Sequence, residues 1–209
     1  DGSECLLEAN DLGAVNMVQG RPFVAGPHLN IYNEATLATY ARYGMRRWVP
    51  PLEAPRTLIE TLHNTRPAGV ETEVFVHGKL PLAFSARCFT ARHYGLNKDD
   101  CQFRCLDHPE GLTVDTREGQ HFLTLNGIQT MSAQSYHLLA EVPAMAAMGI
   151  DILRLSPQVA HMDEIIAAFA AARAGETATA SPAWNANGLV NGYWHGEAGI
   201  AQHSEAACH

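Results

Sequence analysis

Three of the five cysteines lie close together in the sequence and could hold a metal. Cys88, Cys101 and Cys105 form the pattern Cys-x12-Cys-x3-Cys. Thiolates bind soft metals, and iron–sulfur clusters are normally held by four of them. Zinc sites also accept three Cys with one His, which His77, His93 or His108 could supply. The spacing therefore leaves three interpretations open: an iron–sulfur cluster, a zinc site, or free thiols.

Positive charge is concentrated around these cysteines. Four of the 14 Lys and Arg residues of the chain lie between residues 87 and 105, namely Arg87, Arg92, Lys98 and Arg104. A cluster held by four thiolates is negatively charged, and nearby cations stabilise thiolates and tune the redox potential. Asp99 and Asp100 partly offset this charge. The local charge favours an iron–sulfur cluster over the other two interpretations.

The composition describes a folded globular protein. The chain has 209 residues, of which 46% are hydrophobic and 17% are charged, and its net charge is −8. An acidic chain is a poor candidate for binding the phosphate backbone of nucleic acids. No run approaches the roughly 18–20 apolar residues that span a bilayer, and no signal peptide is visible. The odd number of cysteines rules out complete pairing within the chain.

Short extended runs alternate with amphipathic runs along the chain. This pattern predicts strands at 24–32, 46–49, 73–77 and 150–155, helices at 34–43, 56–64, 143–149 and 160–174, and a hairpin of 112–115 with 121–125. Asn33 is expected to cap the first helix and Gly44 to end it. Alternating strands and helices indicate βα units and a largely parallel sheet. There are too few units for a closed barrel of about 250 residues, so an open sheet and an incomplete barrel both fit.

Several polar residues lie where predicted strands end. His77 follows a strand, where barrel enzymes place active-site groups, and it could bind substrate or donate a proton. A structural histidine tied to the turn at Gly78 is an equally good interpretation. Asn126, like Asn10 and Glu53, is more typical of a cap or turn residue than of a catalytic group. The three tryptophans are expected to pack in the core or at an interface: Trp48, Trp184 and Trp194.

Two stretches carry a resemblance to a known family. Val74-Phe75-Val76-His77-Gly78, followed by Ser85-Ala86-Arg87-Cys88, resembles the collagenase-like peptidase superfamily. Within that superfamily, residues 7–16 and the cysteine spacing are similar to the UbiV subfamily rather than to its partner subfamily, UbiU. The resemblance implies an α/β fold of the TIM-barrel type, here incomplete, with an inserted Cys-rich loop at 85–105. Residues 1–175 would form this domain, and residues 176–209 a Trp- and Asn-rich tail.

The same resemblance implies a cofactor. Cys88, Cys101 and Cys105 would be three of the four ligands of a [4Fe-4S] cluster. The fourth cysteine would lie in an N-terminal segment that is missing here, because Cys5 and Cys208 do not match its position. On this hypothesis apolar side chains near Leu6, Leu7 and Val15 would be uncovered.

The resemblance also implies a function. The protein would be the iron–sulfur subunit of an O2-independent hydroxylase in bacterial cytoplasm, acting on ubiquinone precursors with prephenate as oxygen donor. It would form a heterodimer with a UbiU-like protein, through the tail, and work with a lipid-binding accessory protein. The catalytic residues stay unknown, with His77, Arg87 and Asn126 as candidates. Arg87 and Arg92 could hold the carboxylates of the donor, although pairing with Asp99, Asp100 or the cluster is the favoured interpretation.

Two alternatives remain beside this hypothesis. The chain could be a non-catalytic scaffold with a structural metal site, which the cysteine spacing suits equally. It could also be an RNA-hydroxylating relative from the same superfamily, although the acidic charge and the cysteine spacing count against this. Peptidase activity is not expected, because the sequence offers no arrangement of a nucleophile and a base.

Overall fold

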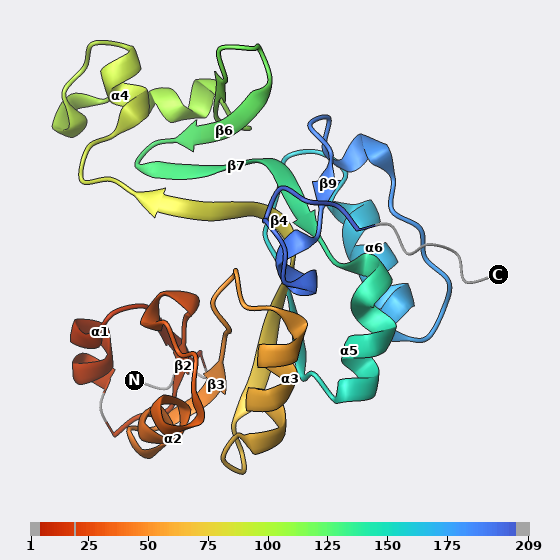
Figure 1. Ribbon diagram of the computed structural model, residues 1–209. Coiled ribbons are helices and arrows are strands. Elements are labelled where there is room, and N and C mark those ends of the chain that lie inside the picture. Colours follow the sequence, from red (N-terminus) through yellow and green to blue (C-terminus); the bar gives the residue numbers. More distant parts are fainter. Residues whose placement is uncertain (1–4, 19, 204–209) are drawn as a thin grey trace. The chain divides into compact units, whose positions relative to one another are not determined.

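The structure is a computed structural model that describes residues 5–18 and 20–203 (Figure 1). The chain divides into two compact units. Unit 1 is drawn from residues 1–76, 140–155 and 191–209, and unit 2 from residues 77–139 and 156–190. This division differs from the expected boundary at residue 175, because the segment after it contributes to both units. Among the described residues, no helix is long and apolar enough to cross a bilayer.

Unit 1 is built on strands that pair in the order in which they occur along the chain. The parallel strands are β1 (Leu7–Ala9), β2 (Phe23–Ala25), β3 (Met45–Trp48) and the beginning of β4 (Glu71–Phe84), and β8 (Ile152–Leu155) also pairs with β4. The helices between them are α1 (Leu12–Val18), α2 (Glu34–Arg42), α3 (Arg56–Thr65) and α5 (Val142–Met148). Sequential order is what consecutive strands show in a β/α barrel. The predicted βα units are confirmed, and β1 is an open end of the described sheet.

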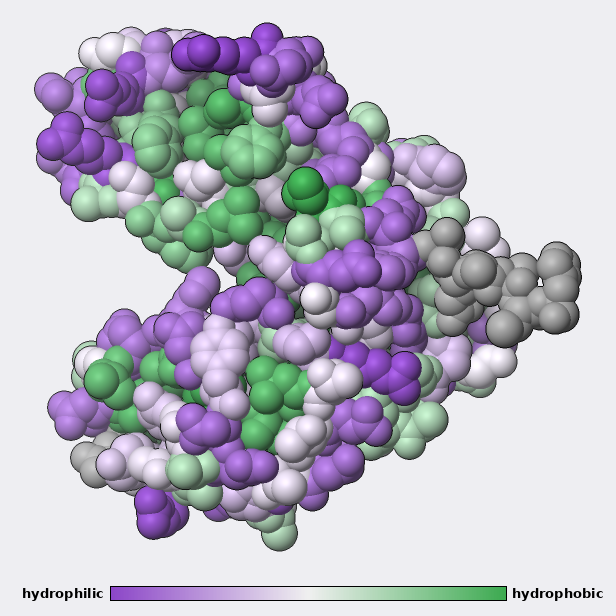
Figure 2. All heavy atoms as spheres, in the orientation of Figure 1, coloured by the Kyte–Doolittle hydropathy of each residue, from purple (hydrophilic) through white to green (hydrophobic). Residues whose placement is uncertain are grey.

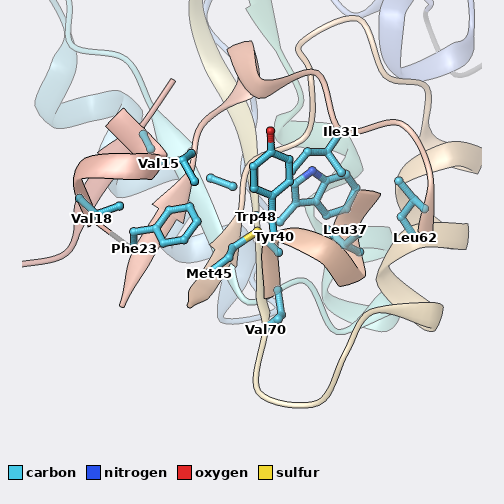
Figure 3. Packing of buried hydrophobic residues seen from close by; sticks show 12 residues of the cluster. Val15, Val18, Phe23, Ile31, Leu37, Tyr40, Met45, Trp48, Leu62 and Val70 are labelled. Atoms are coloured by element: carbon cyan, nitrogen blue, oxygen red, sulfur yellow. The ribbon is translucent and has the colours of Figure 1, made fainter. Parts of the chain in front are cut away.

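The core of unit 1 lies on one face of these strands (Figure 3). Phe23, Met45 and Trp48 are buried there, with Leu37 of α2. Met45 and Trp48 could not both face the core in a regular strand, since side chains alternate between faces. A register shift between β2 and β3 admits one extra residue on β3 and turns both side chains to the same side. At the exposed edge, Leu6 and Leu7 are uncovered as expected, whereas Val15 is buried.

The predicted boundaries of α2 are confirmed. The Asn33 side-chain oxygen accepts a hydrogen bond from the Thr36 backbone N–H at 2.8 Å. Gly44 follows the helix with φ 109°, and a Cβ there would lie 2.8 Å from the Arg21 carbonyl oxygen. Only glycine fits this position without strain.

Replacing Asn33 with alanine is expected to lower the free energy of unfolding by about 1 kcal/mol, because one helix N–H loses its partner. Urea denaturation measures the change. Asn64→Ala is the matched control, since Asn64 is an exposed residue inside α3 and alanine is the better helix former there. Equal losses in the two variants would contradict the capping role.

Unit 2 is antiparallel at its centre. The later half of β4 pairs with β7 (Gln129–His137), β7 with β6 (His121–Asn126), and β6 with β5 (Leu112–Asp115). The short strand β9 (Leu189–Val190) runs parallel to β7. The helices are α4 (Phe89–His93) and α6 (Met162–Arg173). The hairpin expected at residues 112–125 is confirmed.

Two predicted strands differ from those observed. The strand expected at 24–32 ends at Ala25, because Pro27 opens a 3₁₀ turn, Pro27–Leu29, and Asn30 is left-handed with φ 54°. The strand expected at 73–77 continues to Phe84, because β7 supplies a partner for the extra residues. A long-range partner of this kind leaves no trace in the local pattern.

Candidate functional site

Unit 2 contains a cavity of about 530 Å³. Strands β4, β6 and β7 contribute one part of its lining, and the segments 156–161 and 183–187 the other. Asn126, a candidate from the sequence, lies in this lining together with Gln129, Gln158 and Trp184. A cavity of this volume lies in the size range of small-molecule sites.

A chain of hydrogen bonds, which is buried at its two histidines, holds the cavity wall. Gln158 Nε2 donates to the carbonyl oxygens of Ala160 and Trp184, both at 2.8 Å. Gln158 Oε1 lies 3.0 Å from His77 Nε2, and His77 Nδ1 lies 2.9 Å from His137 Nδ1. The carboxamide of Gln158 therefore links the two lining segments. His77 contacts this carboxamide, and His137 contacts His77.

These contacts determine where the protons lie. Because both N–H groups of Gln158 are used, its Oε1 must accept, so His77 carries its proton on Nε2. His77 Nδ1 is then an acceptor, and His137 donates to it from Nδ1. His137 Nε2 is left as a lone pair, and among the described residues this buried atom has no partner.

Burial keeps both rings neutral. It lowers the pKa of His77, against an opposing effect of the hydrogen bond with Gln158. Burial, together with the repulsion that a protonated His77 would exert, lowers the pKa of His137 from 6.5 to about 3. His77 is 0% exposed and is not part of the cavity lining, so the structure gives it a positioning role behind Gln158. Gln158 itself was missed from the sequence, because a single Gln after a strand carries no pattern.

The three cysteines lie on neighbouring elements of unit 2. Cys88 caps α4, and its Sγ accepts from the Ala91 N–H at 3.4 Å. Cys101 follows the 3₁₀ turn Lys98–Asp100, and Cys105 lies in the 3₁₀ helix Arg104–Asp107, which contacts α4. All three thiols are free and half-buried.

The cysteines do not form a finished metal site. Within residues 5–18 and 20–203, no group of three or more His, Cys, Asp or Glu side chains is arranged to hold a metal ion. The histidines considered for zinc have other contacts: His108 Nε2 is 2.6 Å from the Tyr94 hydroxyl, His93 packs on Tyr94, and His77 pairs with His137. The donor chemistry fits a cluster, while convergence on a single site stays a prediction.

A second cavity, of about 580 Å³, lies beside Cys88. Its lining includes Arg87, Arg92 and Lys98. Over the part of the chain that the structure describes, these three cations form no ion pair. The sequence favoured pairing of Arg87 and Arg92 with Asp99, Asp100 or the cluster. Among the described residues, neither arginine pairs with Asp99 or Asp100. Positive charge next to a thiol remains available to an anionic group.

The tail tryptophans are core residues. Trp184 is 5% exposed and packs on His137 in unit 2, whereas Trp194 is 1% exposed in unit 1. Trp194 Nε1 donates to Glu141 Oε2 at 3.0 Å. Their indoles are therefore not interface anchors. The tryptophans were expected to pack either in the core or at an interface, and the structure shows core packing for Trp184 and Trp194.

Unit 1 carries charged side chains on the sheet face opposite its apolar core. Arg47 of β3 pairs with Glu71 at 2.9 Å and with Glu73 at 3.1 Å, both on β4. Arg154 of β8 pairs with Glu73 and also with Glu8 of β1. Sequence reasoning missed this network. The available signal was charge inside predicted strands, at positions that alternate with buried residues.

Unit 2 also exposes large apolar side chains, which Figure 2 shows among the polar residues around α4 and β6. Phe103 is 71% and Leu106 78% exposed, and four others on β4, β6 and the hairpin turn are exposed as well: Leu82, Phe84, Phe122 and Ile128. Exposed apolar side chains mark a surface that meets a partner where they form a contiguous patch.

A family model described as Peptidase family U32 matches residues 5–181. No solved structure matches the chain.

Proposed function

The chain belongs to peptidase family U32, and on that premise we propose that it is the iron–sulfur subunit of an O2-independent hydroxylase in ubiquinone biosynthesis. The observation that carries the proposal is the cysteine segment. Cys88 and Cys105 lie on two elements that contact each other, and the cavity beside Cys88 is lined by three cations that form no ion pair with any described residue. A thiol beside three cations suits a negatively charged cluster.

The proposal assigns the cluster to Cys88, Cys101 and Cys105, with a fourth thiol outside the described residues. A bound cluster would supply one-electron chemistry. The protein's own contribution would be to orient the thiolates, since the Ala91 N–H already donates to the Cys88 sulfur. Arg87, Arg92 and Lys98 would balance the charge.

The basic cavity also suits the oxygen donor. Prephenate carries two carboxylates, and arginine is the preferred partner of such groups because it donates two parallel hydrogen bonds. Arg87 and Arg92 would bind it beside the cysteines. The peptidase description of the family is not expected to apply, since in the described chain no histidine is hydrogen-bonded to a cysteine sulfur.

The exposed apolar side chains of unit 2 support the proposed partners. A UbiU-like subunit or a lipid-binding accessory protein would cover Phe103 and Leu106, which no described residue buries. Because Trp184 and Trp194 are in the core, this surface is a better candidate for the heterodimer contact than the tail.

Counts of iron and sulfide test the proposal. The protein, purified anaerobically with its partner, is expected to hold about four irons and four sulfides. Cys88→Ser, Cys101→Ser and Cys105→Ser are each expected to lose most of the iron and to abolish hydroxylation of a ubiquinone precursor. Cys5→Ser is the matched control, because Cys5 is exposed and outside the segment.

Other outcomes identify the alternatives. A colourless protein with one zinc per chain would contradict the cluster and favour a scaffold with a structural metal site. Full iron content without hydroxylation, in the presence of donor and partner, would contradict the enzymatic assignment. Hydroxylation of RNA in its place would identify the RNA-acting relative, against which the net charge of −8 counts.

A further inference from the structure

The 530 Å³ cavity of unit 2, whose lining includes Asn126 and Gln129, has an electrically neutral lining. Its two oppositely charged side chains, Lys79 and Glu110, lie against each other with Nζ and Oε2 3.7 Å apart. Lys79 Nζ also donates to the Glu110 carbonyl oxygen at 3.0 Å, and Glu110 Oε1 accepts from the Val159 N–H at 3.1 Å. Both charges are thus already used, and an anionic ligand would find no unpaired cation.

Two carboxamides in the lining remain available. Asn126 and Gln129 face each other across the β6–β7 hairpin and are half-buried. Within the described part of the chain, their side-chain amides make no hydrogen bond. The remaining lining amides are engaged: Asn185 donates to Ser135 Oγ at 2.7 Å, and Gln158 is held on both sides. Free amides offer both donors and acceptors to uncharged oxygen substituents.

Trp184 forms a fixed part of the cavity wall, with 5% of the residue exposed. Its Nε1 donates to Glu164 Oε2 at 3.3 Å, and its carbonyl oxygen accepts from Gln158. His137 contacts the ring edge-on, with the ring centroids 5.5 Å apart. Because the wall is ordered before a ligand arrives, little entropy is lost on binding.

From these features we infer that this cavity binds the uncharged aromatic ring of the hydroxylase's acceptor, through contact with Trp184 and hydrogen bonds from Asn126 and Gln129. The inference rests on the proposed function for the identity of that acceptor. It separates the two ligands: a phenol ring with hydroxyl or methoxy groups binds in the neutral cavity, and the dicarboxylate donor does not.

Binding of 2-methoxyphenol to the metal-free protein tests the inference. The indole N–H resonance of Trp184, assigned with a Trp184→Phe variant, is expected to shift in a saturable way. Asn126→Leu and Gln129→Leu are each expected to weaken binding roughly three- to tenfold, which corresponds to one lost hydrogen bond. Gln120→Leu removes an exposed amide outside the cavity, in the turn of the neighbouring β5–β6 hairpin, and is expected to bind normally.

The controls keep this inference separate from the proposed function. Malonate, a small dicarboxylate, is expected not to displace the phenol. Absence of a saturable shift, unchanged affinity in both amide variants whose spectra show a native fold, or displacement by malonate would each overturn the inference. Phenol binding needs no cluster, so a protein that binds the probe but holds no iron after anaerobic purification with its partner would refute the proposed function alone.

Discussion

Replacing Glu73 with alanine is expected to lower the free energy of unfolding by about 2–4 kcal/mol. The Glu73 side chain is 7% exposed and is paired with both Arg47 and Arg154. Removing one member of a buried ion pair leaves its partners desolvated without compensation, which costs about 3–5 kcal/mol in fully buried cases. The arginines are 26% and 28% exposed, so water recovers part of that cost.

Glu71→Ala is the matched control for this prediction. Glu71 lies on the same strand and pairs with the same Arg47, but its side chain is 46% exposed. Exposed ion pairs contribute about 0–1 kcal/mol. Urea denaturation of the two variants gives the comparison, and equal losses would show that burial of Glu73 has no energetic consequence.

Acid is expected to destabilise the protein through His77 and His137. Both rings are neutral in the folded state, whereas in the unfolded chain they take up protons near pH 6.5. The unfolded state therefore binds more protons, and stability rises with pH. For His137 the contribution is complete above about pH 6.5 and is lost as the pH falls toward 3, by up to about 1.4 kcal/mol per pH unit, and His77 adds a loss in the same direction.

His137→Leu isolates the effect. The variant starts less stable at pH 7, because His77 Nδ1 loses its partner. Its stability between pH 6 and pH 4.5 is expected to depend less steeply on pH than that of the native protein, by up to about 1.4 kcal/mol per pH unit. His93→Gln, an exposed histidine of α4, is expected to leave the slope unchanged. Identical slopes in the native protein and His137→Leu would contradict the titration of the buried pair.

Features that depend on near neighbours could be predicted from the sequence. The cap at Asn33, the stop at Gly44 and the hairpin of residues 112–125 each follow from residues within a few positions of one another. Alternation of strands and helices likewise predicted the βα units. The Cys-x12-Cys-x3-Cys pattern and the surrounding cations located the segment in which a cluster is proposed.

The arrangement of side chains across the sheet was decided by tertiary structure. His77 and His137 are 60 residues apart in the chain, and Gln158 is 81 residues from His77. Glu73 and Arg154 are also 81 residues apart. Because side chains alternate along a strand, the sequence indicates which face of the strand a residue occupies. The partner of that residue lies on the neighbouring strand, and the order of the strands is a property of the whole fold. For that reason the sequence alone presented His77 as a candidate catalytic group, and only the fold revealed Gln158 in front of it.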